Sequence, residues 1–213
     1  MTEIYDKQYF EAGLESGKSL YNGFVWMPER SFVEAMAIID ACKLPIGCKI
    51  LDYGSAKGYL VKALRLLGRI AYGCDVSRYA VCTSDPSIRQ YMYLCEDNKL
   101  SFEPEQLRFD IVVAKDVFEH IDIDYLHGVI ENLKRYSKRM FVVVPLGDGK
   151  GRFNVPEYNY DISHINAFTM KDWTRVFEGH AMRCDDAAFY CSGLKNNWAH
   201  HELGNGFFKL SWK

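Results

Sequence analysis

The feature that most constrains the fold is a strand, turn, helix and strand pattern between residues 49 and 77. An apolar run from Lys49 to Tyr53 leads into a glycine-containing turn, a helical pattern follows, and a second apolar run ends at Asp75. This order is typical of a doubly wound α/β sheet, in which ligands bind at the carboxyl ends of parallel strands. Glycines allow the backbone to approach a ligand closely, and the N-terminal amides of the helix favour an anionic group. Asp75 is placed to accept hydrogen bonds from a ribose diol.

The residues of the turn indicate which nucleotide would bind. The turn reads Gly54-Ser55-Ala56-Lys57-Gly58, and Asp52 lies two residues before the first glycine. A dinucleotide site would favour Gly-x-Gly-x-x-Gly. A carboxylate at Asp52 would repel a pyrophosphate and attract an ammonium group. S-adenosylmethionine carries an ammonium group and no phosphate, so it fits this turn better than a dinucleotide does.

The sequence here resembles the class I S-adenosylmethionine-dependent methyltransferases, whose first motif runs Leu-Asp-x-Gly-x-Gly-x-Gly. Ala56 stands where the family usually has its middle glycine, and we expect the loop to accept it with a negative φ. Residues 107–121, with their Asp-Val-Phe-Glu-His run, resemble the fourth-strand motif, and residues 139–145 resemble the fifth strand. The resemblance extends over residues 5–212.

The resemblance implies a set of cofactor-binding residues. They are Asp52, Gly54, Ser55, Ala56, Gly58, Tyr59, Asp75, Val76, Asp97, Lys115 and Val117. In this set Gly54, Ala56 and Gly58 contact the methionine end, and Asp75 holds the ribose. Asp97 ends an expected third strand and lies near the adenine, unless a one-residue shift gives that role to Glu96.

Two histidines are candidate catalytic residues. Methyl transfer from a sulfonium needs no metal, because the leaving group is already activated and the protein mainly aligns the reactants. A general base may still remove a proton from the acceptor. His164 is our first candidate, since it titrates near neutrality, although it could instead anchor its loop by a hydrogen bond. His120 is the second, with a structural or cofactor-side role as the alternative. No cluster in the sequence has metal-ligand spacing, so we expect no metal.

The fold class that we predict is α/β, a doubly wound, mostly parallel seven-stranded sheet with helices on both faces. A single methyltransferase domain spans residues 1–213, a length sufficient for one well-cored domain. From the resemblance, the last strand near residues 207–212 runs antiparallel as a hairpin with residues 181–190. Residues 1–30 form an aromatic arm over the cofactor and acceptor site. Residues 147–168 form an acceptor-side loop, since loops of this length are usually functional.

Composition narrows the classes of function. The net charge of −2 gives no basic surplus, so a nucleic-acid partner is unlikely on this criterion. No stretch approaches the roughly 20 apolar residues of a membrane span. The seven cysteines are scattered, which indicates reduced, buried thiols in a cytoplasmic protein, either a monomer or a homodimer. We predict methyl transfer to the oxygen or nitrogen of a small-molecule acceptor. A macromolecule (protein or nucleic-acid) methyltransferase and a non-catalytic S-adenosylmethionine-binding module are the alternatives.

Overall fold

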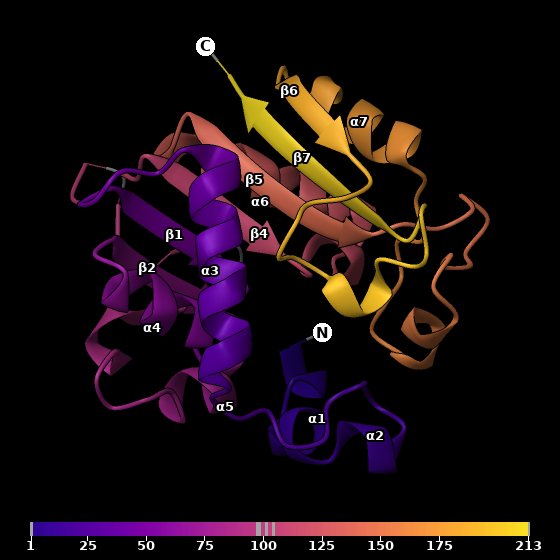
Figure 1. Cartoon of the computed structure of the whole chain (residues 1–213), viewed down its shortest axis with the longest axis horizontal. Helices are drawn as coiled ribbons and strands as arrows, with labels where there is room; N and C mark the ends of the chain where they lie inside the picture. Colours follow the sequence, from indigo (N-terminus) through magenta and orange to yellow (C-terminus); the bar gives the residue numbers. More distant parts are fainter. Residues whose placement is uncertain (1, 97–98, 101, 104, 213) are drawn as a thin grey trace.

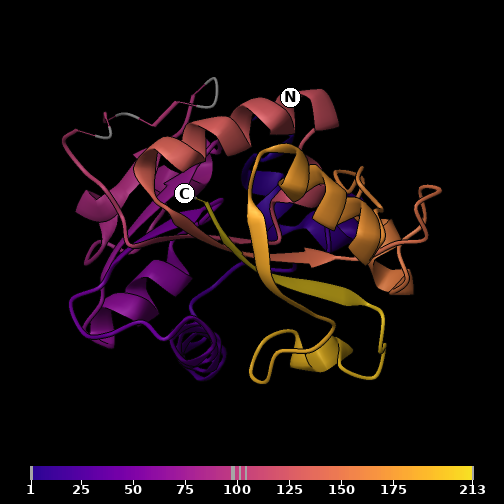
Figure 2. The same ribbon diagram turned by 90° about the horizontal axis from the view of Figure 1, so that it is seen from above.

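The computed structural model describes residues 2–96, 99–100, 102–103 and 105–212, so Asp97 lies outside the described residues (Figures 1 and 2). The described residues form one sheet with the strand order β3-β2-β1-β4-β5-β7-β6. The strands are β1 (Lys49–Tyr53), β2 (Ile70–Asp75), β3 (Met92–Leu94), β4 (Ile111–Lys115), β5 (Arg139–Pro145), β6 (Arg183–Ala188) and β7 (Asn205–Ser211).

Strand directions follow from the connections between the strands. β1 to β5 pair in parallel, whereas β7 pairs antiparallel with both β5 and β6. A parallel pair needs a crossover connection, usually a helix. Within the described chain, the segment between β6 and β7 holds only the short 3₁₀ turn η5 (Asn196–Trp198), so the chain returns as a hairpin. The predicted mostly parallel seven-stranded sheet with an antiparallel last strand is confirmed.

Helices cover both faces of the sheet. The longer ones are α3 (Pro28–Cys42), α4 (Tyr59–Leu66), α6 (Ile123–Tyr136) and α7 (Met170–Gly179), and the short ones are α1 (Lys7–Glu11), α2 (Gly13–Ser16) and α5 (Arg78–Cys82). Four further 3₁₀ turns are η1 (Thr2–Ile4), η2 (Arg89–Tyr91), η3 (Phe118–His120) and η4 (Pro156–Tyr160). Figure 2 shows α6 and α7 on one side of the sheet and α3 and α4 on the other. None of the helices in the described ranges has the length and apolar character that a membrane crossing requires.

The core divides into two layers because successive strand residues point to opposite faces. Leu51 and Val112 pack with α6 and α7 in one buried cluster, whereas their neighbours Ile50 and Val113 pack with α3 and α4 in the other. Both faces are therefore apolar, as a parallel sheet covered on both sides requires. Because both faces are apolar, the polar residues of a ligand-binding site lie at the ends of the strands.

Candidate active site

Two adjoining cavities lie at the carboxyl ends of β1, β2 and β4. The β2-side cavity is lined by Asp75, Val76, Cys95, Val117 and His120 together with aromatic residues of the N-terminal arm (residues 2–27). The α3-side cavity is lined by Asp52, Ser55, Tyr59, Lys115 and residues of the arm and α3. Tyr21, Gly54, Ala56 and Asp116 line both cavities. The two cavities therefore meet over the glycine turn.

The glycine turn is shaped by three residues with positive φ. Gly54 has a φ of +76°, and a Cβ added there would lie 2.3 Å from Cγ2 of Val117. Gly58 also has a φ of +76°, but it packs against Met92 and Ile88 below the turn and lies outside the two cavity linings. A side chain at Gly54 would clash with Val117 after β4, and one at Gly58 with Met92 of β3 and with Ile88.

Ala56 does not adopt the negative φ that we expected. Its φ is +49°, in the left-handed region, where a Cβ costs roughly 1–2 kcal/mol. The conformation is held by a hydrogen bond from the Ala56 amide to Oδ2 of Asp75, at 2.7 Å. The loop thus keeps the backbone shape of a glycine although an alanine occupies the position.

Asp75 ends β2 and connects the turn to the next helix. Its carboxylate accepts hydrogen bonds from the amides of Ala56 at 2.7 Å and Ser77 at 2.8 Å. Burial raises the pKa of Asp75 to about 6, against the opposing effect of these backbone donors. A buried acid fixed in this way lines the β2-side cavity together with Val76, where a ligand's hydroxyl groups can reach it.

Asp52 lies in β1 at the base of the α3-side cavity. Burial raises the pKa of this carboxyl to about 7, with Lys115 lowering it and Asp75 raising it further. Asp52 lines the α3-side cavity together with Ser55 and Lys115, so a ligand in the cavity can reach the carboxyl group. A ligand that brings a positive charge to this position would favour the ionised carboxylate.

A chain of charges runs along the α3-side cavity. The ammonium of Lys115 lies 2.9 Å from Oδ2 of Asp116 and 3.9 Å from Oε2 of Glu34, whose other oxygen accepts from Nε of Arg30 at 2.9 Å. Burial acts to lower the pKa of Lys115, but Asp116 and Glu34 raise it above its ordinary value. Sequence reasoning missed Arg30 and Glu34. Their spacing of four residues on one helix face before the first strand was the signal that could have found them.

The N-terminal arm covers the cavities and is tied to the glycine turn. The ammonium of Lys57 contacts the Glu11 carboxylate and donates to the Phe24 carbonyl at 2.8 Å. The Ser77 hydroxyl donates to the Tyr5 carbonyl at 2.5 Å. Tyr5, Tyr9, Phe10 and Tyr21 of the arm line the β2-side cavity. Lys57 therefore fixes the arm to the glycine turn through its contacts with Glu11 and Phe24.

The arm also meets the loop of residues 147–168, called here the acceptor-side loop. The Tyr9 hydroxyl donates to Oδ2 of Asp161 at 3.1 Å and lies 3.4 Å from Oγ of Ser163. The loop therefore supports Tyr9, which lines the β2-side cavity, although the loop itself supplies none of the residues that line it.

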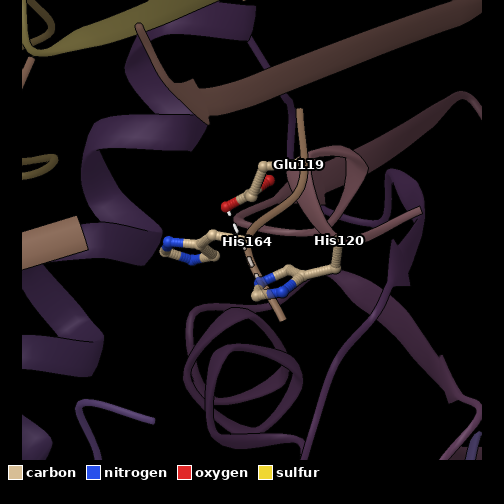
Figure 3. Close-up of side chains that lie close together, drawn as sticks. All are labelled: Glu119, His120 and His164. Atoms are coloured by element: carbon tan, nitrogen blue, oxygen red, sulfur yellow. Dashed lines mark ion pairs between the residues drawn. The ribbon is translucent and has the colours of Figure 1, made fainter. Parts of the chain in front are cut away.

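The two candidate catalytic histidines lie next to each other, with ring centroids 4.6 Å apart (Figure 3). His120 lines the β2-side cavity, and its Nδ1 lies 2.9 Å from Oγ of Ser163. His164 lies behind it, with Nδ1 2.7 Å from the Tyr158 carbonyl oxygen. Burial lowers the pKa of His120 to about 4 and also lowers that of His164, so both imidazoles are neutral near pH 7.

A third side chain, Glu119, completes this cluster (Figure 3). Its carboxyl group is buried, and burial raises its pKa well above the ordinary value. Sequence reasoning read the Asp-Val-Phe-Glu-His run as a family motif and did not single out this glutamate. Its position next to His120 was the available signal.

The two acids considered for the adenine contact follow β3. Glu96 is exposed, and its carboxylate lies 3.4 Å from the guanidinium of Arg78. Cys95, one residue earlier, lines the β2-side cavity. Asp97, the other predicted acid, lies outside the described residues.

A match to a family model identifies the family of this chain. The model of the methyltransferase domain matches residues 26–182, which include both strands of the glycine-turn unit and the His120 and His164 cluster. The chain belongs to this methyltransferase family. The predicted membership in the class I S-adenosylmethionine-dependent methyltransferases is confirmed, and with it the enzyme class and the cofactor S-adenosylmethionine.

Solved structures share the fold of this methyltransferase. An S-adenosylmethionine-dependent methyltransferase from Clostridium acetobutylicum is 12% identical, with 84% of this chain and 91% of that chain covered and a TM-score of 0.61. The 1,6-didemethyltoxoflavin-N1-methyltransferase of Burkholderia thailandensis is 15% identical, with 86% and 78% covered and a TM-score of 0.63. Magnesium protoporphyrin IX methyltransferase from Synechocystis, with bound S-adenosylmethionine, is 12% identical, with 100% and 97% covered and a TM-score of 0.63. No curated protein matches the chain in sequence.

Proposed function

We propose that this methyltransferase transfers a methyl group to the oxygen or nitrogen of a small-molecule acceptor. The observation that carries the proposal is the aromatic wall that the arm gives the β2-side cavity. The loop of residues 147–168 holds this wall from behind, through the bond of Tyr9 to Asp161 and the contact of Ser163 with His120, so the space left for an acceptor is bounded by packed side chains. The Burkholderia and Synechocystis enzymes of the same fold are named for small acceptors, which agrees with this reading.

The cofactor would span both cavities. We propose that its ammonium group pairs with Asp52 and its carboxylate with Arg30 in the α3-side cavity, because these groups offer the complementary charges. The ribose then reaches Asp75, and the adenine packs near Val76 and Cys95. The sulfonium would lie close to Gly54, where the two cavities meet.

The glycine turn would serve this cofactor mainly through its backbone. Gly54, Ser55 and Ala56 line the cavities and leave room for the methionine end, and Tyr59 and Lys115 border it. Val117 packs over Gly54 at the point where the sulfonium would lie. Gly58 acts by allowing the turn to close rather than by touching the cofactor.

The two histidines are the proposed catalytic residues. His120 lies on the cavity wall and His164 directly behind it, so both belong to the acceptor half of the reaction. Their neutral state leaves a nitrogen lone pair available to a proton or to another electrophile.

Labelled S-adenosylmethionine tests the proposal. The protein would be incubated with a cell extract separated by dialysis into small molecules and macromolecules. We expect the methyl label to appear in the dialysable fraction. Label only in protein or nucleic acid would favour the macromolecule alternative, and cofactor binding without any labelled product would favour a non-catalytic module.

We also propose a cytoplasmic location and a monomeric or homodimeric assembly. All seven cysteines are free, and burial raises the pKa of Cys42 to about 12, which disfavours the reactive thiolate. These thiols support a cytoplasmic location, where they stay reduced. A monomer or homodimer is expected and can be distinguished by light scattering.

A further inference from the structure

We propose that Glu119, His120 and His164 together bind one divalent transition-metal ion at the acceptor end of the β2-side cavity. One ligand atom from each residue lies within 4.8 Å of the others. Figure 3 shows the Glu119 carboxylate pointing toward the two imidazoles. Only the ion's role in methyl transfer rests on the proposed function, and ion binding itself does not.

The hydrogen bonds of the two imidazoles leave Nε2 free in both. Nδ1 of His164 lies 2.7 Å from the Tyr158 carbonyl oxygen, which can only accept, so Nδ1 carries the proton. Oγ of Ser163 donates to Oδ1 of Asp161 at 2.5 Å and therefore accepts from Nδ1 of His120 at 2.9 Å. Metal-binding histidines usually have this arrangement, in which the second nitrogen donates to a carbonyl or polar oxygen and fixes the ring.

The Glu119 carboxyl group lacks a partner. Its side chain is 1% exposed, and within the described residues neither oxygen makes a hydrogen bond. Its Oε1 lies 3.9 Å from Nε2 of His120, beyond hydrogen-bond distance. A buried carboxyl group in this state is costly unless a proton or a cation compensates it. A metal ion would supply that compensation while it engages both free imidazole nitrogens.

The main chain holds the cluster together before any ion binds. The Glu119 carbonyl accepts hydrogen bonds from the amides of Ile165 at 2.8 Å and Asn166 at 3.0 Å. Asn166 also donates through its side chain to the Phe118 and Ile121 carbonyls. The acceptor-side loop is therefore fixed to η3 by residues 165–166 after His164 and by the contact of Ser163 with His120 before it, which preorganises the three ligands.

Two ammonium groups in the described part of the chain, those of Lys195 and Lys115, act electrostatically on Glu119. The Lys195 ammonium is already paired with Oδ1 of Asp116 at 2.5 Å and lies 3.3 Å from the Tyr158 hydroxyl. Asp116 also pairs with Lys115. Asp116 thus holds both ammonium groups, and Glu119 remains available.

The donor set indicates the class of ion. Two imidazole nitrogens with one carboxylate suit Zn²⁺, Mn²⁺, Fe²⁺ or Co²⁺, whereas Mg²⁺ and Ca²⁺ prefer oxygen ligands. Three protein ligands leave coordination positions open, as in catalytic sites. Because His120 lines the cavity, these positions would face the acceptor.

An ion at this position would activate an acceptor hydroxyl. Coordination lowers the pKa of the hydroxyl, and its proton passes to water. An oxygen lone pair then forms the bond to the methyl carbon while the carbon–sulfur bond breaks and its electron pair stays on sulfur. The products are the methylated acceptor and neutral S-adenosylhomocysteine. The histidines would then act as ligands, and the ion would replace a general base.

Cobalt substitution tests the site. The chelator-treated, dialysed full chain would be titrated with Co²⁺, whose visible absorption reports nitrogen and oxygen ligands, and the bound ion would then be displaced with Zn²⁺. We expect one Co²⁺ per chain in the wild type. Glu119→Gln and His164→Gln should each weaken binding by about tenfold or more, the scale of losing part of a metal site. Circular dichroism would verify that each variant is folded.

The matched control is a histidine pair on the surface. Nδ1 of His127 lies 2.6 Å from Nε2 of His180, and Nδ1 of His180 bonds Glu131, so this pair is the obvious site for adventitious cobalt. His127→Gln should leave the absorption of the proposed site unchanged. No saturable band in the wild type, or a band that survives Glu119→Gln and His164→Gln, would overturn the proposal.

Failure of the ion site and failure of the proposed function are distinguishable. Full methyl transfer to a small acceptor by the metal-free protein would remove the ion's role and leave the proposed function intact. One bound Co²⁺ per chain without any methylated small molecule would support the ion site and contradict the proposed function.

Discussion

The proposed cofactor side and the proposed acceptor side of this methyltransferase are assembled in different ways. The cofactor side, residues 52–76, is one continuous strand–turn–helix–strand unit whose key groups bond one another directly, as Asp75 does with Ala56. The acceptor side combines the arm, Glu119 with His120, and the acceptor-side loop, which meet only in the folded chain. The first side is rigid because its backbone admits few conformations. The second depends on side-chain contacts between distant segments.

The largest expected effect concerns the cofactor side. Gly54→Ala would place a Cβ 2.3 Å from Val117 at a φ of +76°, so strain and overpacking together should destabilise the fold by about 3 kcal/mol. Cofactor affinity, measured by calorimetry, should fall by about a hundredfold, the equivalent of about 3 kcal/mol. Gly17→Ala is the matched control, because Gly17 has a φ of +68° but no atoms near its Cβ position. Equal losses in the two variants would show that the close packing against Val117 is unimportant.

The acceptor side should respond in turnover rather than in cofactor binding. His164→Gln is expected to lower the rate by about 10², whether the histidine accepts a proton or binds an ion. Steady-state kinetics with the identified acceptor, together with calorimetry for the cofactor, measures both quantities. His127→Gln, on the surface, serves as the control. A variant that loses cofactor affinity along with turnover would contradict the division into two sides.

Asp75→Ala tests the cofactor side by a smaller change. Loss of the ribose contacts should weaken S-adenosylmethionine binding by about 2 kcal/mol, the scale of hydrogen bonds to a charged group. Asp110→Ala is a suitable control. Asp110 also accepts a hydrogen bond from a backbone amide, that of Lys49, but it lies at the amino ends of β1 and β4, away from the site. Unchanged affinity in Asp75→Ala would exclude Asp75 from the site.

The pH dependence of S-adenosylmethionine binding tests whether Asp52 pairs with the ammonium group of the cofactor. Burial raises its pKa to about 7, and the cofactor's ammonium group prefers the ionised carboxylate that predominates above that pH. Affinity should therefore rise with pH up to about 7, with a slope that approaches tenfold per unit well below it. Calorimetry between about pH 5 and 7 measures this slope. Asp52→Asn should remove the Asp52 part of this slope and leave only the part from Asp75, whose pKa is about 6. A wild-type profile no steeper than that of the variant would rule out the pairing.

The smallest expected effect concerns Ala56. Ala56→Gly removes the strain of a Cβ at a φ of +49°, roughly 1–2 kcal/mol, but adds the entropy cost of a glycine, about 0.5–1 kcal/mol. The net gain in the free energy of unfolding should be about 0.5–1 kcal/mol. Denaturant unfolding checks it, and a loss of stability would show that the alanine is unstrained in this loop.

The same division explains what the sequence predicted. The parallel strands and the glycine turn were predictable, because motif and strand are contiguous there. The reversed last strand was predicted from the family resemblance. The φ of Ala56 was not, because the hydrogen bond to Asp75 fixes it and the residue type does not. On the acceptor side, sequence spacing gave no sign that His164 would meet His120 and Glu119, since the loop brings them together only through tertiary contacts.

Arg30 was missed for a related reason. It lies on a helix before the first motif, and only packing of α3 along the sheet places it at the α3-side cavity. Its partner Glu34 connects it to Lys115 through long-range contacts that no local pattern encodes.

A crystal structure of the protein with S-adenosylhomocysteine tests the central claim most directly, because it locates both sides of the site at once. We expect the ribose hydroxyls on Asp75, the ammonium group on Asp52, and the sulfur facing His120 beneath the arm. A product bound elsewhere, or a sulfur atom that points away from His120, would contradict the division of this site into a cofactor side and an acceptor side.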